Sequence, residues 1–85
     1  MAKVEVYSTP YCPYCIRAKH YLDKEDIDYI NFDVSRQPEL RREMFDRSNG
    51  GTTVPQIFIN DQSIGGCDEM MQLARAGELN ELLQP

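Results

Sequence analysis

Cys12 and Cys15 are the residues of this 85-residue chain whose type and spacing most directly suggest chemistry. They enclose a proline and a tyrosine in the segment TPYCPYCIRA, residues 9–18. Cysteines at this spacing can bind a metal ion, form a structural disulfide or exchange electrons with other thiols. Each of these uses defines a different kind of protein, so the surrounding sequence has to decide among them.

Neither a structural disulfide nor a metal site fits the pair well. A disulfide across so short a loop would stabilise the fold by about 2 kcal/mol before strain, because the gain shrinks with loop length. A closed zinc site needs about four ligands, and the further candidates are His20 and Cys67. We expect His20 to face solvent, and Cys67 is distant along the chain. We therefore expect no metal and favour redox chemistry.

The helix predicted after Cys12 supports the redox interpretation. Pro13 suits a first helical turn, where its missing N–H costs no hydrogen bond. Side chains at i and i+3 of a helix lie about 5–6 Å apart, close enough for a disulfide. Because helix N–H groups and the helix dipole stabilise negative charge, we expect the Cys12 thiolate to be the nucleophile. Cys15, one turn deeper, is expected to be buried and to act as the resolving thiol.

Apolar periodicity and turn residues predict an alternation of strands and helices. The expected elements are a strand at 3–7, a helix after Cys12, a strand at 27–34, a helix at 38–47, strands at 55–60 and 62–66, a helix at 67–77 and a last helical turn at 78–83. A βαβ unit followed by a hairpin and a helix predicts an α/β fold of order βαβαββα, with helices packed on a four-stranded mixed sheet.

The same periodicity indicates which apolar side chains share a face of each element. These are Val4 and Val6; Cys15, Ala18 and Leu22; Ile30, Phe32 and Val34; Leu40, Met44 and Phe45; and Met70, Leu73 and Ala74. For the helix at 38–47 we expect Leu40, Met44 and Phe45 to make the core contacts.

Length and charge exclude several classes of protein. A chain this short predicts a single domain, residues 1–85. Nine basic against fourteen acidic residues give a net charge of −5, which argues against nonspecific nucleic-acid binding. No apolar run approaches the ~20 residues of a membrane span, and MAKVEVYS at the start lacks the apolar core of a secretory signal. We expect a cytoplasmic protein with no nucleic-acid or membrane partner.

Three motifs together make the chain resemble a dithiol glutaredoxin. CPYC at 12–15, TVP at 53–55 and GGCD at 65–68 match the signatures of that family in order and at suitable spacing. The resemblance covers essentially the whole chain. It implies a thioredoxin-like fold, a monomer, and a glutathione-dependent thiol–disulfide oxidoreductase.

The resemblance also implies a glutathione site. Tyr14 is expected to border a groove, and the backbone of Thr53 and Val54 to pair with the cysteine part of glutathione like an added strand. The peptide before Pro55 is expected to be cis. The remaining implied contacts are Cys67 and Asp68 at the γ-glutamyl end, and Arg41 at the glycine carboxylate, where Thr9 replaces a basic residue of many family members.

The implied reaction starts with attack by Cys12 on a protein disulfide or a glutathionylated protein. Cys15 then releases a reduced protein product, and glutathione, kept reduced by glutathione reductase, restores the pair. For glutathione mixed disulfides, Cys12 alone could suffice. Two other functions stay open: a carrier of an iron–sulfur cluster held by Cys12 and glutathione, and a thioredoxin-like reductase. Pro13 and the dithiol motif favour the enzyme over the carrier.

Overall fold

Four strands form one mixed sheet at the centre of the molecule. The computed structural model describes residues 2–84. Its elements are β1 (Val4–Ser8), α1 (Pro13–Lys24), β2 (Ile30–Asp33), α2 (Pro38–Arg47), β3 (Gln56–Ile59), β4 (Gln62–Gly65), α3 (Cys67–Arg75) and α4 (Glu78–Leu83). The strands lie in the order β2-β1-β3-β4, with β1 parallel to β2 and antiparallel to β3, and β4 antiparallel to β3.

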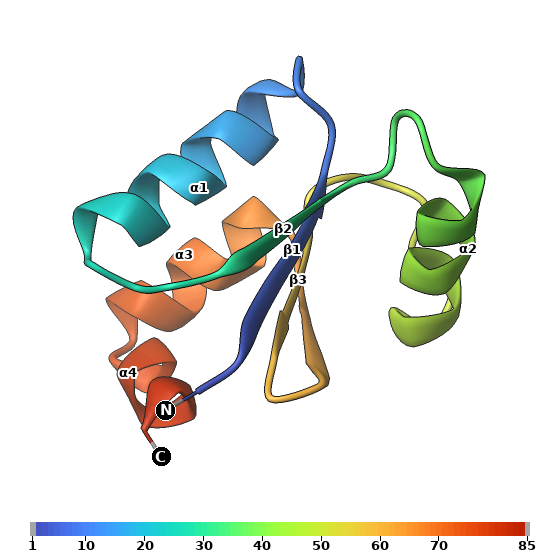
Figure 1. The fold of residues 1–85 in the computed structure, drawn as a ribbon. Coiled ribbons are helices and arrows are strands. Elements are labelled where there is room, and N and C mark those ends of the chain that lie inside the picture. Colours follow the sequence, from blue (N-terminus) through green and yellow to red (C-terminus); the bar gives the residue numbers. More distant parts are fainter. Residues whose placement is uncertain (1, 85) are drawn as a thin grey trace.

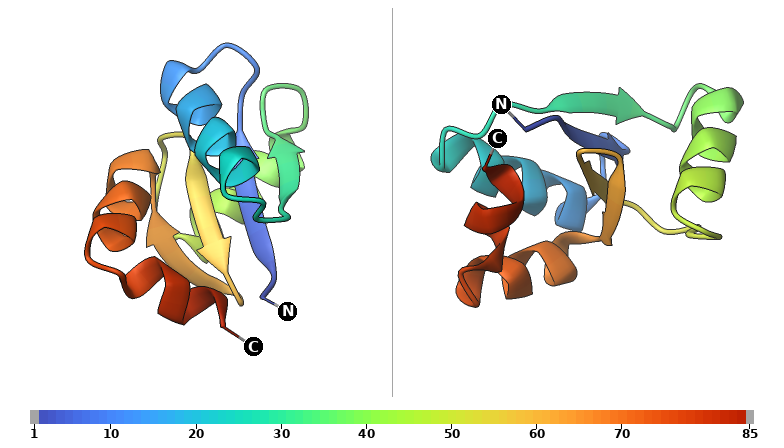
Figure 2. Two further views of the ribbon diagram at one scale, coloured as in Figure 1. Left: turned by 90° about the vertical axis from the view of Figure 1, so that its left-hand side faces the viewer. Right: turned by 90° about the horizontal axis from the view of Figure 1, so that it is seen from below.

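Helices cover both faces of the sheet. Figure 1 shows α1 and α3 on one side and α2 alone on the other, and the end-on view in Figure 2 separates the same three layers. All five residues of β1 are buried as a result. A strand covered on both faces needs apolar or well-paired side chains on both, so simple alternation of polar and apolar residues is lost.

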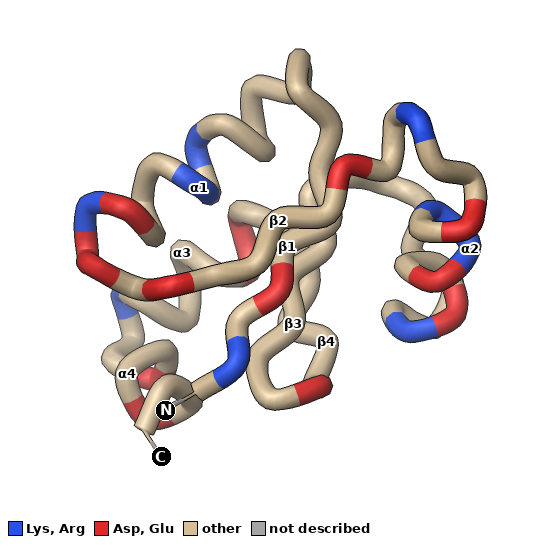
Figure 3. Tube along the Cα trace, viewed as in Figure 1, with Lys and Arg blue, Asp and Glu red and all other residues tan. Residues whose placement is uncertain are grey.

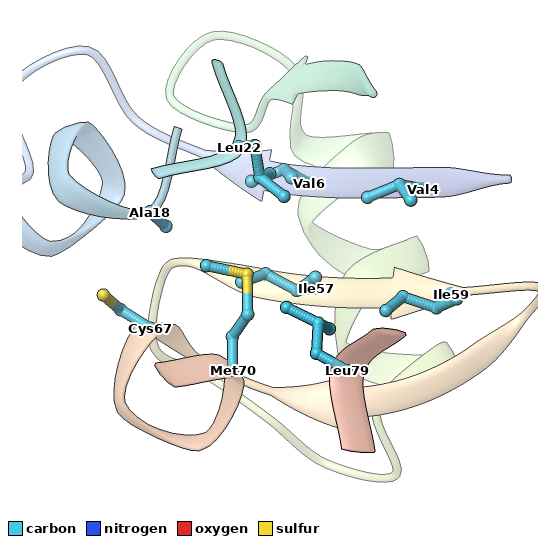
Figure 4. Packing of buried hydrophobic residues seen from close by; sticks show 9 residues of the cluster. All are labelled: Val4, Val6, Ala18, Leu22, Ile57, Ile59, Cys67, Met70 and Leu79. Carbon is cyan, nitrogen blue, oxygen red and sulfur yellow. The ribbon is translucent and has the colours of Figure 1, made fainter. Parts of the chain in front are cut away.

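The main core lies between the sheet and the helices α1, α3 and α4. Figure 4 shows Val4 and Val6 of β1 beside Ile57 and Ile59 of β3, facing the apolar sides of those helices. The helices contribute Ala18, Leu22, Cys67, Met70 and Leu79. Fully burying an aliphatic side chain of this size stabilises a fold by roughly 1.5–3 kcal/mol. This core holds α1 and α3 in fixed positions on the same face of the sheet.

A charged clamp attaches α2 to the opposite face. Arg47 at the end of α2 donates from Nη2 to Glu5 Oε1 at 2.8 Å and from Nη1 to Tyr7 Oη at 2.7 Å. Its guanidinium also lies 4.3 Å from the centre of the Phe58 ring. The hydrogen bond to Glu5 is the main reason why the pKa of Arg47 is raised. The clamp supplements a small apolar cluster of Tyr7, Val34, Met44 and Phe58.

The predicted order of elements is confirmed, and several details differ. The strand expected at 27–34 is limited to Ile30–Asp33. Phe45 was expected in the core, but its side chain is 47% exposed. The prediction was wrong because Leu40, Met44 and Arg47, at i, i+4 and i+7, form the face of α2 that meets the sheet, and Phe45 points away from it. Ile30 shares a face with Phe32 as expected but is 52% exposed.

The buried face of α1 agrees with the sequence, whereas the helix expected at 67–77 ends at Arg75. Leu22, Ala18 and Cys15 are buried on one face of α1, and His20 is exposed, as expected. Within residues 2–84 there is no helix with the length and apolar character that crossing a membrane requires.

Candidate active site

The sulfur of Cys12 occupies the N-cap position of α1. The backbone of Cys12 is extended, with φ −89° and ψ 117°, and Pro13 begins the helix. Cys12 Sγ accepts a hydrogen bond from the backbone N–H of Cys15 at 3.1 Å. This is the place that a Ser or Asp oxygen takes in an ordinary N-cap. The Cys12 sulfur therefore lies at the positive end of the helix dipole, where the sequence predicts it.

Cys15 is more deeply buried than Cys12, and its pKa is raised. Both thiols are free, and Cys12 is partly accessible while Cys15 is 0% exposed. Burial, together with its hydrogen bond to Cys12, raises the pKa of Cys15 to about 11. Cys15 is therefore a neutral thiol at neutral pH. This asymmetry allows an external disulfide to reach Cys12 and keeps Cys15 one turn behind it.

The segment before β3 approaches Cys12 from the other side. Cys12 Sγ donates to the carbonyl oxygen of Val54 at 3.6 Å. The Val54–Pro55 peptide is cis, as the family resemblance implied. Gln56, which the sequence analysis did not select, donates from Nε2 to the Thr53 carbonyl at 2.9 Å. This hydrogen bond holds the backbone of Thr53 in place next to Cys12. The position of Gln56 directly after the TVP motif is the sequence feature that could have identified it.

A pocket of about 380 Å³ opens beside the cysteine pair. It is formed where α1 and α3 begin and where the chain enters β3, and Figure 1 shows these segments at one end of the sheet. Its lining includes six of the predicted glutathione-site residues, namely Tyr14, Thr53, Val54, Pro55, Cys67 and Asp68. The other lining residues are Gln56, Gly65, Gly66 and Glu69. Segments far apart in sequence therefore converge on one recess.

Cys67 and Asp68 begin α3 and have different environments. Cys67 is 3% exposed and packs in the main core. Burial is the main reason why the pKa of Cys67 is raised, so this third thiol is held neutral and shielded. Asp68 is exposed in the first turn of α3. Figure 3 shows acidic residues near the start of α3 and basic residues along α1.

Arg41 lies outside this pocket. It lines a separate, larger recess of about 550 Å³ between α2 and the chain before Thr53, together with Arg42, Phe45 and Thr52. The linings of the two recesses meet at one point of the chain, because Thr52 lines one recess and Thr53 lines the other. The structure thus gathers the predicted residues around Cys12 with the exception of Arg41, which borders the neighbouring recess.

Comparison with known sequences gives a consistent result. The family model described as Glutaredoxin matches residues 4–64. The chain is 47% identical over 83 residues to a glutaredoxin of Pseudomonas aeruginosa, covering 98% of each chain. It is 45% identical over 84 residues to glutaredoxin 3 of Escherichia coli K12, covering 99% of this chain and 100% of that protein.

Solved structures agree with the sequence comparison. A buckwheat glutaredoxin in complex with glutathione matches with a TM-score of 0.85 and 31% identity, over 94% of this chain and 74% of that one. The solution structure of a glutaredoxin from Brucella melitensis matches with a TM-score of 0.83 and 44% identity, over 98% of this chain and 89% of that one. These likenesses confirm the predicted thioredoxin-like α/β fold.

Proposed function

Since this chain belongs to the glutaredoxin family of glutathione-dependent thiol–disulfide oxidoreductases, we propose that Cys12 is its nucleophile and Cys15 its resolving thiol. The observation that carries this assignment is the position of Cys12 Sγ. It lies at the N-cap of α1, 3.1 Å from the Cys15 nitrogen, beside the pocket formed by the Val54–Pro55 segment and the start of α3. The accessible thiol can react first with an external disulfide, and the buried thiol behind it can react second, with the intermediate.

With a protein disulfide, the first step is attack by the Cys12 thiolate on one sulfur. A new S–S bond joins Cys12 to the substrate, and the other substrate sulfur leaves as a thiolate and takes up a proton. Cys15 then loses its proton and attacks Cys12 Sγ, which releases the second substrate thiol and leaves a Cys12–Cys15 disulfide. Two glutathione molecules supply the two electrons that reduce this bond and become glutathione disulfide.

With a protein–glutathione mixed disulfide, Cys12 is sufficient. Its thiolate attacks the glutathione sulfur and releases the protein thiol, which takes up a proton. A second glutathione thiolate then attacks the Cys12–glutathione bond, regenerating Cys12 and forming glutathione disulfide. Cys15 takes no part in this route, so the two substrate classes can be distinguished by removing it.

The pocket beside Cys12 is the proposed glutathione site. The Val54 carbonyl beside Cys12 Sγ supports pairing of the cysteine part of glutathione with the segment Thr53–Pro55. The start of α3 at Cys67 offers N–H groups to the γ-glutamyl carboxylate, and the Asp68 carboxylate suits its ammonium group. Tyr14 borders the same pocket. Arg41, from the neighbouring recess, is the proposed contact for the glycine carboxylate in place of Thr9.

The proposed partners follow from this chemistry. They are glutathione, proteins carrying disulfides or glutathione mixed disulfides, and glutathione reductase, which acts only through glutathione. The reaction depends on a pool of reduced glutathione, so we place it in the cytoplasm and assign it to one domain spanning the chain.

A coupled assay tests the proposal. The purified protein, a small glutathione mixed disulfide, glutathione, NADPH and glutathione reductase should give NADPH oxidation that depends on both the protein and glutathione. Activity with a thioredoxin reductase and none with glutathione would contradict the proposal. Visible absorption after anaerobic purification, with no turnover of the mixed disulfide, would instead support a cluster carrier.

A further inference from the structure

Glu69 makes a capping contact in the wall of the pocket. Its carboxylate Oε1 accepts a hydrogen bond from the backbone N–H of Gly66 at 2.7 Å. Glu69 is the third residue of α3, and Gly66 is the N-cap. This is one half of a capping box; the other half cannot form because glycine has no side-chain oxygen. The Glu69 side chain is exposed to solvent and yet is tied to the turn that precedes its own helix.

The turn held by Glu69 consists of two consecutive glycines. Gly65 ends β4 with φ +100°, a conformation that favours glycine. A Cβ atom at Gly65 would lie 2.9 Å from Glu69 Cγ, so the Glu69 side chain occupies the space that a larger residue would need. A Cβ atom at Gly66 would lie 3.2 Å from the Pro55 carbonyl oxygen on the other side of the pocket. The glycine pair is therefore packed between Glu69 and the Val54–Pro55 segment.

Two adjacent glycines have more backbone freedom than any other dipeptide, and ordering them costs conformational entropy. The backbone of this turn leads directly into the first N–H groups of α3, at Cys67 and Asp68, which have no intrahelical acceptor. The Gly66 carbonyl accepts from the Met70 N–H at 3.0 Å as part of the helix, and the Glu69 carboxylate adds the one side-chain hydrogen bond to the Gly66 N–H, just before those donors. A site that is already ordered binds its ligand more tightly, because less entropy is lost on binding.

We propose that Glu69 is a positioning residue for glutathione. Its hydrogen bond to Gly66 holds the Gly65–Gly66 turn so that the N–H groups at the start of α3 are aligned for the γ-glutamyl carboxylate. Glu69 acts through this bond and does not touch the reacting sulfurs. The inference rests on the proposed function, since it assigns a role within the proposed glutathione site.

The test compares Glu69→Ala, Glu69→Gln and Glu78→Ala in the glutathione-dependent assay. Glu69→Ala should raise the KM for glutathione about fivefold, the effect of a lost cap of about 1 kcal/mol, with kcat little changed. Glu69→Gln should stay close to wild type, because the amide oxygen can still accept from Gly66. Glu78, an exposed acid in the first turn of α4, is the matched control and should leave KM unchanged.

Two further measurements separate this role from a loss of folding. Reduction of a disulfide driven by dithiothreitol, which needs no glutathione, should be the same in all four proteins. Amide hydrogen exchange at Gly66 should be slow in wild type and Glu69→Gln and fast in Glu69→Ala.

An unchanged KM in Glu69→Ala, fast Gly66 exchange in wild type, or a Glu69→Gln variant as impaired as Glu69→Ala would each overturn the inference while leaving the proposed function intact. A wild-type protein that does not turn over glutathione would overturn the proposed function itself.

Discussion

The backbone N–H of Cys15 donates to the sulfur of Cys12 at 3.1 Å. The residue that is proposed to resolve the mixed disulfide therefore also donates a backbone hydrogen bond to the nucleophile, which caps the helix. One turn of helix supplies both relationships, because residues i and i+3 lie on the same side of an N-terminal turn. The Cys12 sulfur remains partly accessible, and the Cys15 thiol lies behind it in the core.

Burial of Cys15 predicts a pH-dependent loss of stability in the reduced protein. Its pKa rises from an ordinary 9.0 to about 11, so the fold favours the protonated thiol. The resulting stabilisation is fully present below about pH 9 and is lost as the pH rises through about 11. The measurement is the free energy of unfolding in urea, for wild type and Cys15→Ser, each kept reduced with a phosphine.

The free energy of unfolding of wild type, minus that of Cys15→Ser, should fall as the pH rises from about 9 to about 11. Burial also raises the pKa of Tyr7, to about 12, but Tyr7 is present in both proteins and cancels in the comparison. A difference that stays constant with pH would show that the acidity of Cys15 is not perturbed by the fold.

The clamp at Arg47 predicts a measurable contribution to stability. Arg47→Met keeps an aliphatic chain near Phe58 but leaves the Glu5 carboxylate, whose side chain is 10% exposed, without this partner. Hydrogen bonds to charged groups contribute about 2 kcal/mol, and we expect a loss of that size in the free energy of unfolding. Arg75→Met, at an exposed position in the last turn of α3, should change stability by less than about 0.5 kcal/mol. Equal stability of the two variants would show that the clamp is unimportant.

Neighbouring apolar residues of α2 should respond differently to truncation. Met44 is 0% exposed in the cluster with Tyr7 and Phe58, whereas Phe45 is 47% exposed. Met44→Ala should lower the free energy of unfolding by about 3 kcal/mol, and Phe45→Ala by less than about 1 kcal/mol because it leaves no core cavity. Unfolding of both variants under identical conditions checks this. A larger loss of stability for Phe45→Ala than for Met44→Ala would show that Phe45, and not Met44, faces the sheet.

The parts of the site encoded in short segments were predictable from sequence. Spacing and helix-start signals are enough to place Cys12 at the N-terminus of α1 and Cys15 one turn inside the helix. The order of elements follows from apolar periodicity and turn residues, since both act over a few positions. Motifs of the family supplied the contributions of Thr53–Pro55, Cys67 and Asp68 to the pocket.

Contacts between distant residues were not predictable in the same way. Arg47 meets Glu5 across 42 positions of sequence, and nothing in either local segment indicates the pairing. Phe45 was misplaced because α2 uses the polar Arg47, rather than a third apolar residue, to complete its sheet-facing side. Glu69 was missed because its cap contains glycine where a capping box usually has Ser or Thr.

The most direct test of the central claim is a comparison of Cys12→Ser with Cys15→Ser in deglutathionylation of a protein mixed disulfide, using glutathione as reductant. Cys12→Ser should lose the activity entirely, because the remaining two thiols, Cys15 and Cys67, are buried. Cys15→Ser should retain much of it and should accumulate a Cys12–glutathione adduct detectable by mass. Equal loss in both variants, or activity retained in Cys12→Ser, would contradict the assignment of nucleophile and resolving thiol.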